Sequence, residues 1–163
     1  MDSVWMELPR SAFPPLREDL HVQVCVVGGG IAGLTSAYLL SRAGRSVALL
    51  DDGAPGSGMT QMSTGHLTCM LDDRFFELER LRGREAARLA AESHTAAIER
   101  IAAIVAGERI DCDLARLDGY LFLAPGDVPE TLERELEAAR RAGLHRVTRQ
   151  ERAPFPSFDS GPC

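Results

Sequence analysis

Residues 24–35 read VCVVGGGIAGLT, an apolar run that meets three glycines and then a helix-forming stretch. The spacing matches G-x-G-x-x-G at Gly28, Gly30 and Gly33. In such a turn the first glycine allows a sharp exit from a strand, and the second lets the backbone approach a pyrophosphate. The third lets the helix pack closely. This stretch therefore predicts a strand–turn–helix site for a dinucleotide.

The segments on both sides of the turn extend this prediction to a βαβ unit. Apolar runs at 21–27 and 47–50 have the composition of strands buried on both faces of a parallel sheet. Between them, residues 31–43 carry apolar side chains at helical spacing, and Gly44 stands where a left-handed cap would end a helix. This order, in about thirty residues, predicts an α/β fold with a Rossmann-type unit.

Asp51 follows the second predicted strand, eighteen positions after Gly33. A carboxylate at this place can accept hydrogen bonds from ribose hydroxyls and disfavours a 2′-phosphate, which makes NADP a poor candidate. The N–H groups at the start of the predicted helix would face the phosphate charge. FAD and NAD both use this arrangement, so the motif by itself leaves the choice between them open.

Helical patterns dominate the second half of the chain. After a loop at 52–68, apolar spacing predicts helix over 72–107, either as one long helix or as two helices broken near Gly83. A further helix is expected over 129–143, because proline opens it and glycine closes it.

Strand-like runs at 110–116 and 120–123 flank the Asp-Gly pair at 118–119, which is typical of a β-hairpin turn. Residues 145–149 are a candidate short strand. The expected organisation is a lead-in over 1–20, a nucleotide-binding βαβ unit with its loop over 21–71, part of an α+β domain over 72–150, and a linker over 151–163.

Composition excludes several classes of function. The formal net charge of −6 argues against a nucleic-acid partner. All eighteen basic residues other than histidine are arginine, so neither a Schiff-base lysine nor a P-loop lysine is available. We interpret the small arginine clusters at 80–84 and 140–141 as solvated faces. No signal-peptide pattern or bilayer-length apolar run is found, so a cytoplasmic protein without a membrane partner is expected.

The four cysteines lack the spacing of a zinc site or a disulfide scaffold. They are Cys25, Cys69, Cys112 and Cys163, and no two of them form a CxxC pair. Cys25 lies within the first predicted strand and is expected to be a small core residue. No metal site is predicted.

Several motifs taken together resemble a known family. They are the stretch at 24–35, DDG at 51–53, and a loop with GSG at 56–58, Thr60 and STGHLT at 63–68 that resembles a flavin-contacting loop. They resemble the D-amino-acid oxidase-like family of FAD-dependent oxidoreductases, and in particular a bacterial branch often fused to a C-terminal Rieske iron–sulfur domain. The resemblance covers most of 22–125. It implies FAD rather than NAD as the cofactor, and a GR2-like flavoprotein fold.

The resemblance also implies roles for individual residues. The pyrophosphate would be held by Gly28, Gly30, Ile31, Ala32 and Gly33. The adenosine ribose would be bound by Asp51, with Asp52 in the same cofactor-binding loop. The ribityl chain and isoalloxazine would lie along Ser63, Thr64, His66 and Leu67. Two positions depart from the family pattern, because Asp51 replaces the usual Glu and Met62 replaces a usual basic residue.

The function implied by the resemblance is oxidation of the C–N bond of a small amine or amino acid by hydride transfer to flavin. No catalytic residue is assigned. Two strands do not make a stable parallel sheet, so we expect an N-terminal part of a longer enzyme whose partner is its own missing C-terminal part. The alternatives are an NAD-binding dehydrogenase and a non-catalytic piece with an incomplete nucleotide site.

Overall fold

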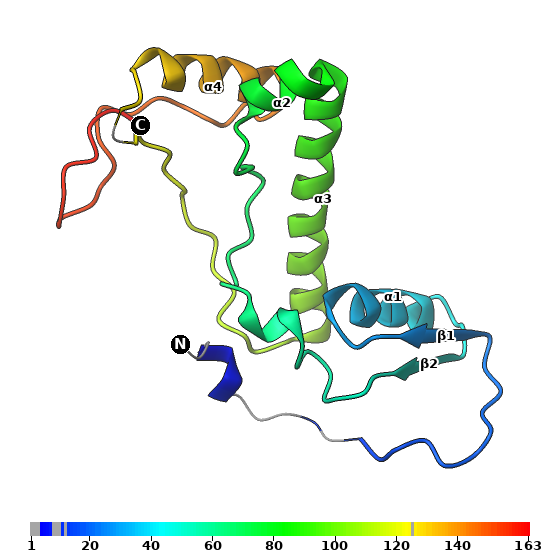
Figure 1. Ribbon diagram of the computed structural model, residues 1–163. Helices are drawn as coiled ribbons and strands as arrows, with labels where there is room; N and C mark the ends of the chain where they lie inside the picture. Colours follow the sequence, from blue (N-terminus) through cyan, green and yellow to red (C-terminus); the bar gives the residue numbers. More distant parts are fainter. Residues whose placement is uncertain (1–3, 8–10, 12, 125) are drawn as a thin grey trace. The chain divides into compact units, whose positions relative to one another are not determined.

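The computed structural model describes residues 4–7, 11, 13–124 and 126–163 (Figure 1). The chain forms two compact units, Met1–His66 and Leu67–Cys163. Within the predicted lead-in, a 3₁₀ helix η1 spans Val4–Glu7, whereas residues 1–3, 8–10 and 12 lie outside the described residues.

The first unit contains the predicted βαβ unit. Strand β1 (Val24–Val27) is followed by helix α1 (Ile31–Arg42) and strand β2 (Val47–Leu50). The strands pair in parallel, with Val24 opposite Val47 and Val27 opposite Leu50. Helix α1 ends as expected, because Gly44 has a φ of +79° and its N–H donates to the Ser41 carbonyl at 2.9 Å. The strand–helix–strand order read from the sequence is confirmed.

The prediction that both strands are buried on both faces is wrong for the described residues. Val27 is 82% exposed, and Cys25, predicted to be a core residue, is exposed as well. The sheet found here has only these two strands, with α1 packed against both. The apolar composition is that of central strands, but the neighbours that would bury them are not among these residues.

The second unit consists of helices that enclose a small core. Helix α2 spans Phe75–Arg82, α3 spans Arg84–Glu108 and α4 spans Glu130–Arg141. Helix α2 packs against both α3 and α4 (Figure 1). The buried cluster consists of Phe75, Ala87, Ala91, Ala138, Ala139 and Ala142. Because most of these side chains are alanine, the helices can approach one another closely around a single aromatic ring.

Gly83 separates α2 from α3, which confirms the broken-helix alternative. Its φ of +83° and ψ of 163° interrupt the helical backbone in a conformation that residues with a Cβ rarely adopt. Helix α3 ends one residue beyond the expected Gly107, and α4 lies within the expected 129–143.

The predicted hairpin at 110–123 is wrong. No strand is found there, and neither Asp118 nor Gly119 has the positive φ that a type I′ turn requires. Instead Tyr120 packs edge-on against Phe155, with ring centroids 5.8 Å apart. A two-stranded hairpin is marginal without a surface to cover, and these residues have no sheet beside them.

The predicted strand at 145–149 is also wrong. The Val147 N–H donates to the Leu144 carbonyl in a turn, and the Val147 carbonyl accepts hydrogen bonds from the Arg140 guanidinium at 3.2 and 3.3 Å. These polar groups are therefore used locally rather than in a sheet. In the described part of the second unit the structure has no strand, so the α+β character expected for 72–150 is not found there.

Across the described residues, no helix combines the length and the apolar character that crossing a bilayer requires.

Candidate functional site

The first turn of α1 packs so closely on the turn after β1 that position 33 has no room for a side chain. Gly28 has a φ of +104°, and its N–H donates to the Leu50 carbonyl at 2.8 Å. A Cβ built on Gly33 would lie 1.8 Å from the Gly28 carbonyl oxygen. Helix α1 therefore starts directly against the turn, and any residue larger than glycine at position 33 would push the two apart.

The N-terminus of α1 is capped by a residue from a distant loop. The cap residue Gly30 has no side chain to offer, and the Ile31 N–H donates to Oγ1 of Thr60 at 3.1 Å. Thr60 lies in the 3₁₀ helix η2 (Met59–Met62). Its hydroxyl therefore lies at the end of α1 where the helix dipole carries positive partial charge.

Thr60 is not among the predicted site residues. Its position in the sequence is 29 residues from Ile31, and no local pattern shows which hydroxyl of the loop folds back. The only available indication was its place in the loop that resembles the family's flavin-contacting segment.

Asp51 joins the end of β2 to the glycine turn. Its Oδ2 accepts a hydrogen bond from the Gly29 N–H at 2.5 Å, and its Oδ1 accepts one from the Gly53 N–H at 2.8 Å. These two backbone hydrogen bonds, Gly29 first, hold the pKa of Asp51 below its ordinary value, so the carboxylate is ionised near neutral pH. Each carboxylate oxygen can accept a second hydrogen bond, and Asp51 is exposed.

The loop after β2 closes back over the turn. The Gly56 N–H donates to the Gly29 carbonyl at 2.8 Å, which ties this loop to the turn. Asp52 is exposed and makes no hydrogen bond with another described residue. Ala32 lies in the first turn of α1, beside Gly33.

The predicted flavin segment at 63–67 is an exposed loop. Its backbone is ordered by local hydrogen bonds from Gly65 N–H to Ser63 Oγ at 3.1 Å and from His66 N–H to Thr64 Oγ1 at 3.3 Å. His66 and Leu67 are exposed, and they lie on either side of the division between the two units. The structure therefore brings together the glycine turn, Asp51 and Thr60, and shows no hydrogen bond between these groups and the side chain of His66 among the described residues.

The assembled groups match the chemistry of a dinucleotide. The turn is free of side chains, the helix end offers positive partial charge and a hydroxyl, and Asp51 offers an ionised acceptor. The space that a Cβ at Gly33 would fill is used for close packing, which is the geometry the fingerprint requires. These residues fit the ADP portion of FAD.

Comparison with known proteins places the chain in a family. Residues 23–161 match the family DAO, described as FAD dependent oxidoreductase. Over 135 residues the chain is 35% identical to a Bacillus subtilis (strain 168) protein named "Putative Rieske 2Fe-2S iron-sulfur protein YhfW". It is 33% identical over 132 residues to the gamma-glutamylputrescine oxidoreductase of Escherichia coli (strain K12). A D-amino acid dehydrogenase of Methylobacterium sp. (strain 4-46) is 53% identical over 38 residues.

The first two matches cover most of this chain, and all three cover only part of the relative. They cover 83%, 80% and 23% of the chain, and 26%, 30% and 9% of the respective relatives. No solved structure matches the chain. The family match extends over both units and names FAD, whereas the glycine turn alone left the choice between FAD and NAD open. The chain belongs to the DAO family of FAD dependent oxidoreductases.

Proposed function

We propose that the glycine turn, Asp51 and Thr60 bind the ADP portion of FAD in an enzyme that oxidises the C–N bond of a small amine or amino acid. The observation that carries this proposal is the junction of β1 and α1, where Gly33 leaves no room for a Cβ and Asp51 is anchored to Gly29. When bound, FAD would accept the hydride that leaves the substrate.

Each group of the site has a separate task in this proposal. The backbone of Gly28, Gly30, Ile31, Ala32 and Gly33 would surround the pyrophosphate at the helix end. Thr60 would orient the first free N–H of α1 and donate its own hydroxyl proton to a phosphate oxygen. Asp51, with Asp52 beside it, would accept hydrogen bonds from the adenosine ribose, because its outward lone pairs are not used by the backbone.

The exposed segment at 63–67 is proposed to lie along the ribityl chain and isoalloxazine, through Ser63, Thr64, His66 and Leu67. Its exposure supports this assignment, since the local hydrogen bonds of Ser63 and Thr64 order the backbone and leave the His66 side chain free of a described partner. His66 is therefore proposed as a neighbour of flavin and not as an acid–base group.

The substrate class rests on the relatives. One of them is named for gamma-glutamylputrescine, an amine, and another for D-amino acids. No residue of this chain is assigned to substrate, because no described side chain is tied to that role.

The active enzyme is proposed to include further polypeptide against the βαβ unit. Val27 is 82% and Ile31 is 62% exposed, and an apolar surface of this kind at the cofactor end of a parallel sheet is normally covered. The chain spans less than a third of each relative, which supports a missing C-terminal part. Without that polypeptide, the chain would be the non-catalytic piece with an incomplete nucleotide site that the sequence left as an alternative.

Cofactor binding and catalysis can be tested in one series. The purified protein is titrated with FAD and, separately, with NAD, and binding is followed by quenching of flavin fluorescence and by calorimetry. FAD is expected to bind more tightly than NAD, and FAD binding should disappear in Gly33→Val. Tighter binding of NAD than FAD would overturn the proposal in favour of an NAD-binding dehydrogenase.

The substrate class is tested by mixing the flavin-loaded protein anaerobically with amines, D-amino acids and, as a control, 2-hydroxy acids. Loss of the yellow flavin absorbance with the nitrogen compounds alone is the expected result. Bleaching by the hydroxy acids but not by the amines would contradict the proposed bond.

A further inference from the structure

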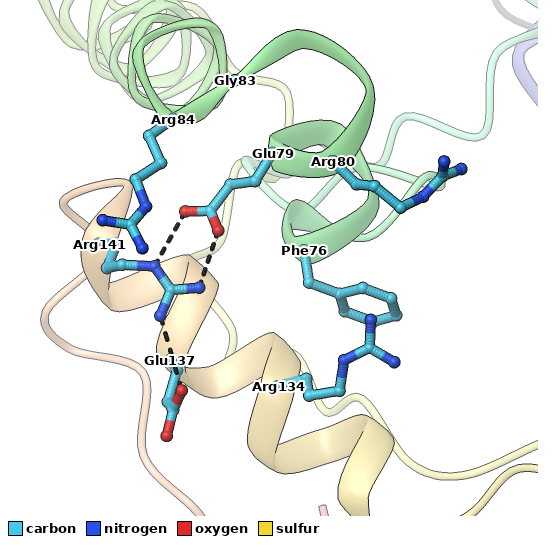
Figure 2. A pocket seen from close by; sticks show the side chains of 8 residues that line it. All are labelled: Phe76, Glu79, Arg80, Gly83, Arg84, Arg134, Glu137 and Arg141. Atoms are coloured by element: carbon cyan, nitrogen blue, oxygen red, sulfur yellow. Dashed lines mark hydrogen bonds and ion pairs between the residues drawn. The ribbon is translucent and has the colours of Figure 1, made fainter.

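The arginine clusters at 80–84 and 140–141, which the sequence suggested were solvated faces, each contribute to the lining of one groove of the second unit, through Arg80, Arg84 and Arg141. The groove has a volume of about 410 Å³ and lies between α2, the start of α3 and α4 (Figure 2). Its lining residues are Phe76, Glu79, Arg80, Gly83, Arg84, Arg134, Glu137 and Arg141. Four arginines against two glutamates give the groove an excess of two positive charges in a chain of formal net charge −6.

The middle of the groove is taken up by an ion pair between Arg141 and Glu79. Arg141 donates to both carboxylate oxygens of Glu79, at 3.1 and 2.8 Å, and its Nη1 lies 3.6 Å from Glu137. The side chain of Glu79 is 12% exposed. The hydrogen bond from Arg141, and the charges of Arg141 and Arg84, lower the pKa of Glu79. Arg141 is therefore held by both oxygens of Glu79, whereas Glu137 is only a distant ion-pair partner with an exposed side chain.

The remaining arginines keep donors available. The side chain of Arg84 makes no hydrogen bond with another described residue, although its charge contributes to the lowered pKa of Glu79. The guanidinium of Arg134 lies 4.2 Å from the centre of the Phe76 ring, and stacking of this kind leaves the N–H groups at its edge unused. Arg80 is engaged by Glu77 through Nε at 2.7 Å. Arg84 and Arg134 are thus the arginines of the groove whose guanidinium groups make no hydrogen bond to a carboxylate among the described residues.

These two charges lie on opposite sides of the Glu79–Arg141 pair (Figure 2). A chain that carries several carboxylates can pair with both of them. The guanidinium group of arginine can bind a carboxylate through two parallel hydrogen bonds. Arg84 also begins the 25-residue helix α3, whose N-terminal dipole adds positive partial charge at that end of the groove.

We propose that this groove binds an acidic segment of a partner polypeptide, with carboxylates that pair with Arg84 at one end and Arg134 at the other. The formal charge of −6 on the whole chain disfavours a long polyanion such as nucleic acid, while a short acidic segment responds to the local excess of positive charge. This inference is independent of flavin binding, since none of its residues belongs to the first unit.

The test uses the full chain and a fluorescein-labelled hexaglutamate peptide, with binding followed by fluorescence anisotropy at low ionic strength. The wild-type chain is expected to bind hexaglutamate and not hexalysine, and the affinity should fall as salt is added. Arg84→Glu combined with Arg134→Glu is expected to weaken binding about tenfold or more, because two attractive contacts become repulsive.

Arg100→Glu is the matched control, because it makes the same charge change at an exposed position of α3 outside the groove. It should change the affinity less than about twofold. Arg84→Glu by itself guards against a folding defect, since a glutamate in the first turn of α3 favours the helix dipole. It should still weaken binding several-fold while the circular dichroism is unchanged.

Three results would overturn the proposal. They are an absence of hexaglutamate binding, equal losses in Arg84→Glu and Arg100→Glu, and tighter binding of inorganic pyrophosphate at the same residues. The last result would assign the groove to a compact oxyanion instead.

Discussion

The two units of this chain bury their apolar side chains to very different extents. Every buried hydrophobic residue among those described lies in the second unit, and most of them form the cluster around Phe75. The first unit leaves Val27 82% and Met59 82% exposed, although its strands are the most apolar runs of the sequence. A helical unit can close a small core with its own alanines, whereas a two-stranded parallel sheet needs further elements. The difference separates a unit with a buried core of its own from one whose apolar side chains stay exposed among the described residues.

The largest effect is expected from filling the tightest point of the first unit. In Gly33→Val the new side chain would collide with the Gly28 carbonyl oxygen, which lies 1.8 Å from the Cβ position. Such overpacking costs about 1–3 kcal/mol or more, and it should abolish FAD binding because α1 moves off the turn. Thermal unfolding measures the loss of stability, and the flavin content after purification measures the loss of FAD binding.

Gly107→Ala is the control, since the space around that glycine of α3 is open. Retained flavin in Gly33→Val would show that the close packing of α1 on the turn does not matter for the cofactor.

The second prediction concerns the core of the second unit. Glu135 is 3% exposed and accepts hydrogen bonds from the Phe75 N–H at 2.9 Å and the Phe76 N–H at 3.2 Å, so it caps α2 from α4. Glu135→Ala leaves both donors without this partner and is expected to lower the free energy of unfolding by about 2–3 kcal/mol. Urea denaturation followed by circular dichroism measures the loss.

Glu135→Gln keeps one acceptor oxygen and should lose less stability than Glu135→Ala. Equal losses in the two variants would mean that packing, and not the cap, explains the effect. FAD binding should be unchanged in both, if the two units are energetically separate.

The third prediction concerns Asp51 and pH. Hydrogen bonds from Gly29 and Gly53 lower its pKa below the ordinary 3.8. Its contribution to stability is therefore fully present above that value and is lost as the pH falls through the lower, folded-state pKa. Unfolding of the first unit should be insensitive to Asp51 titration between about pH 5 and pH 8 and should become easier below about pH 4.

Asp51→Asn should remove this acid-dependent part and weaken FAD binding about tenfold, because the charged acceptor is replaced by a neutral amide. Unfolding curves at several pH values, with and without FAD, distinguish the two effects. Identical acid sensitivity in the variant and the wild type would assign the pH dependence to other carboxylates.

A smaller effect is expected at Thr60. Thr60→Val keeps the shape but removes the acceptor of the Ile31 N–H, which should cost about 0.5–1.5 kcal/mol of stability and reduce FAD affinity several-fold. Thr60→Ser retains the hydroxyl and should behave like the wild type. A serine variant as weak as the valine variant would argue that the methyl group, not the hydroxyl, matters.

The smallest effect is expected for an exposed ion pair of the second unit. Arg116 and Glu99 lie 2.8 Å apart, with side chains 62% and 61% exposed. Arg116→Ala should change stability by less than about 0.5 kcal/mol, because solvent and salt screen such pairs. A loss comparable to that of Glu135→Ala would mean that the surface of α3, and not only the buried cluster, holds this unit together.

Features that depend on local backbone conformation could be predicted from the sequence. Glycines at 44, 83 and 143 have positive φ, and each stands at the end of a helix where the pattern placed it. The βαβ order follows from the same kind of information, since Gly28 and Gly33 impose the geometry of the turn within a few residues. The match of residues 23–161 to the DAO family agrees with the family inferred from those motifs.

Features that depend on which segments meet could not be predicted in this way. The Asp-Gly pair at 118–119 suggested a hairpin, but its strands have no sheet to join. Thr60 reaches α1 from 29 residues away, and Glu135 reaches α2 from 60 residues away. Arg80 and Arg141 line the same groove only because α2 and α4 pack together.

By itself, then, the sequence determined the glycine turn, the acid that follows it, the helix ends and the family. These depend on backbone torsions and on short-range spacing, which neighbouring residues set. Only the tertiary structure decided that the strands remain exposed, that Thr60 and Glu135 cap helices, and that two arginine clusters share a groove. Burial and long-range hydrogen bonds depend on the contacts between distant segments, and no local pattern contains that information.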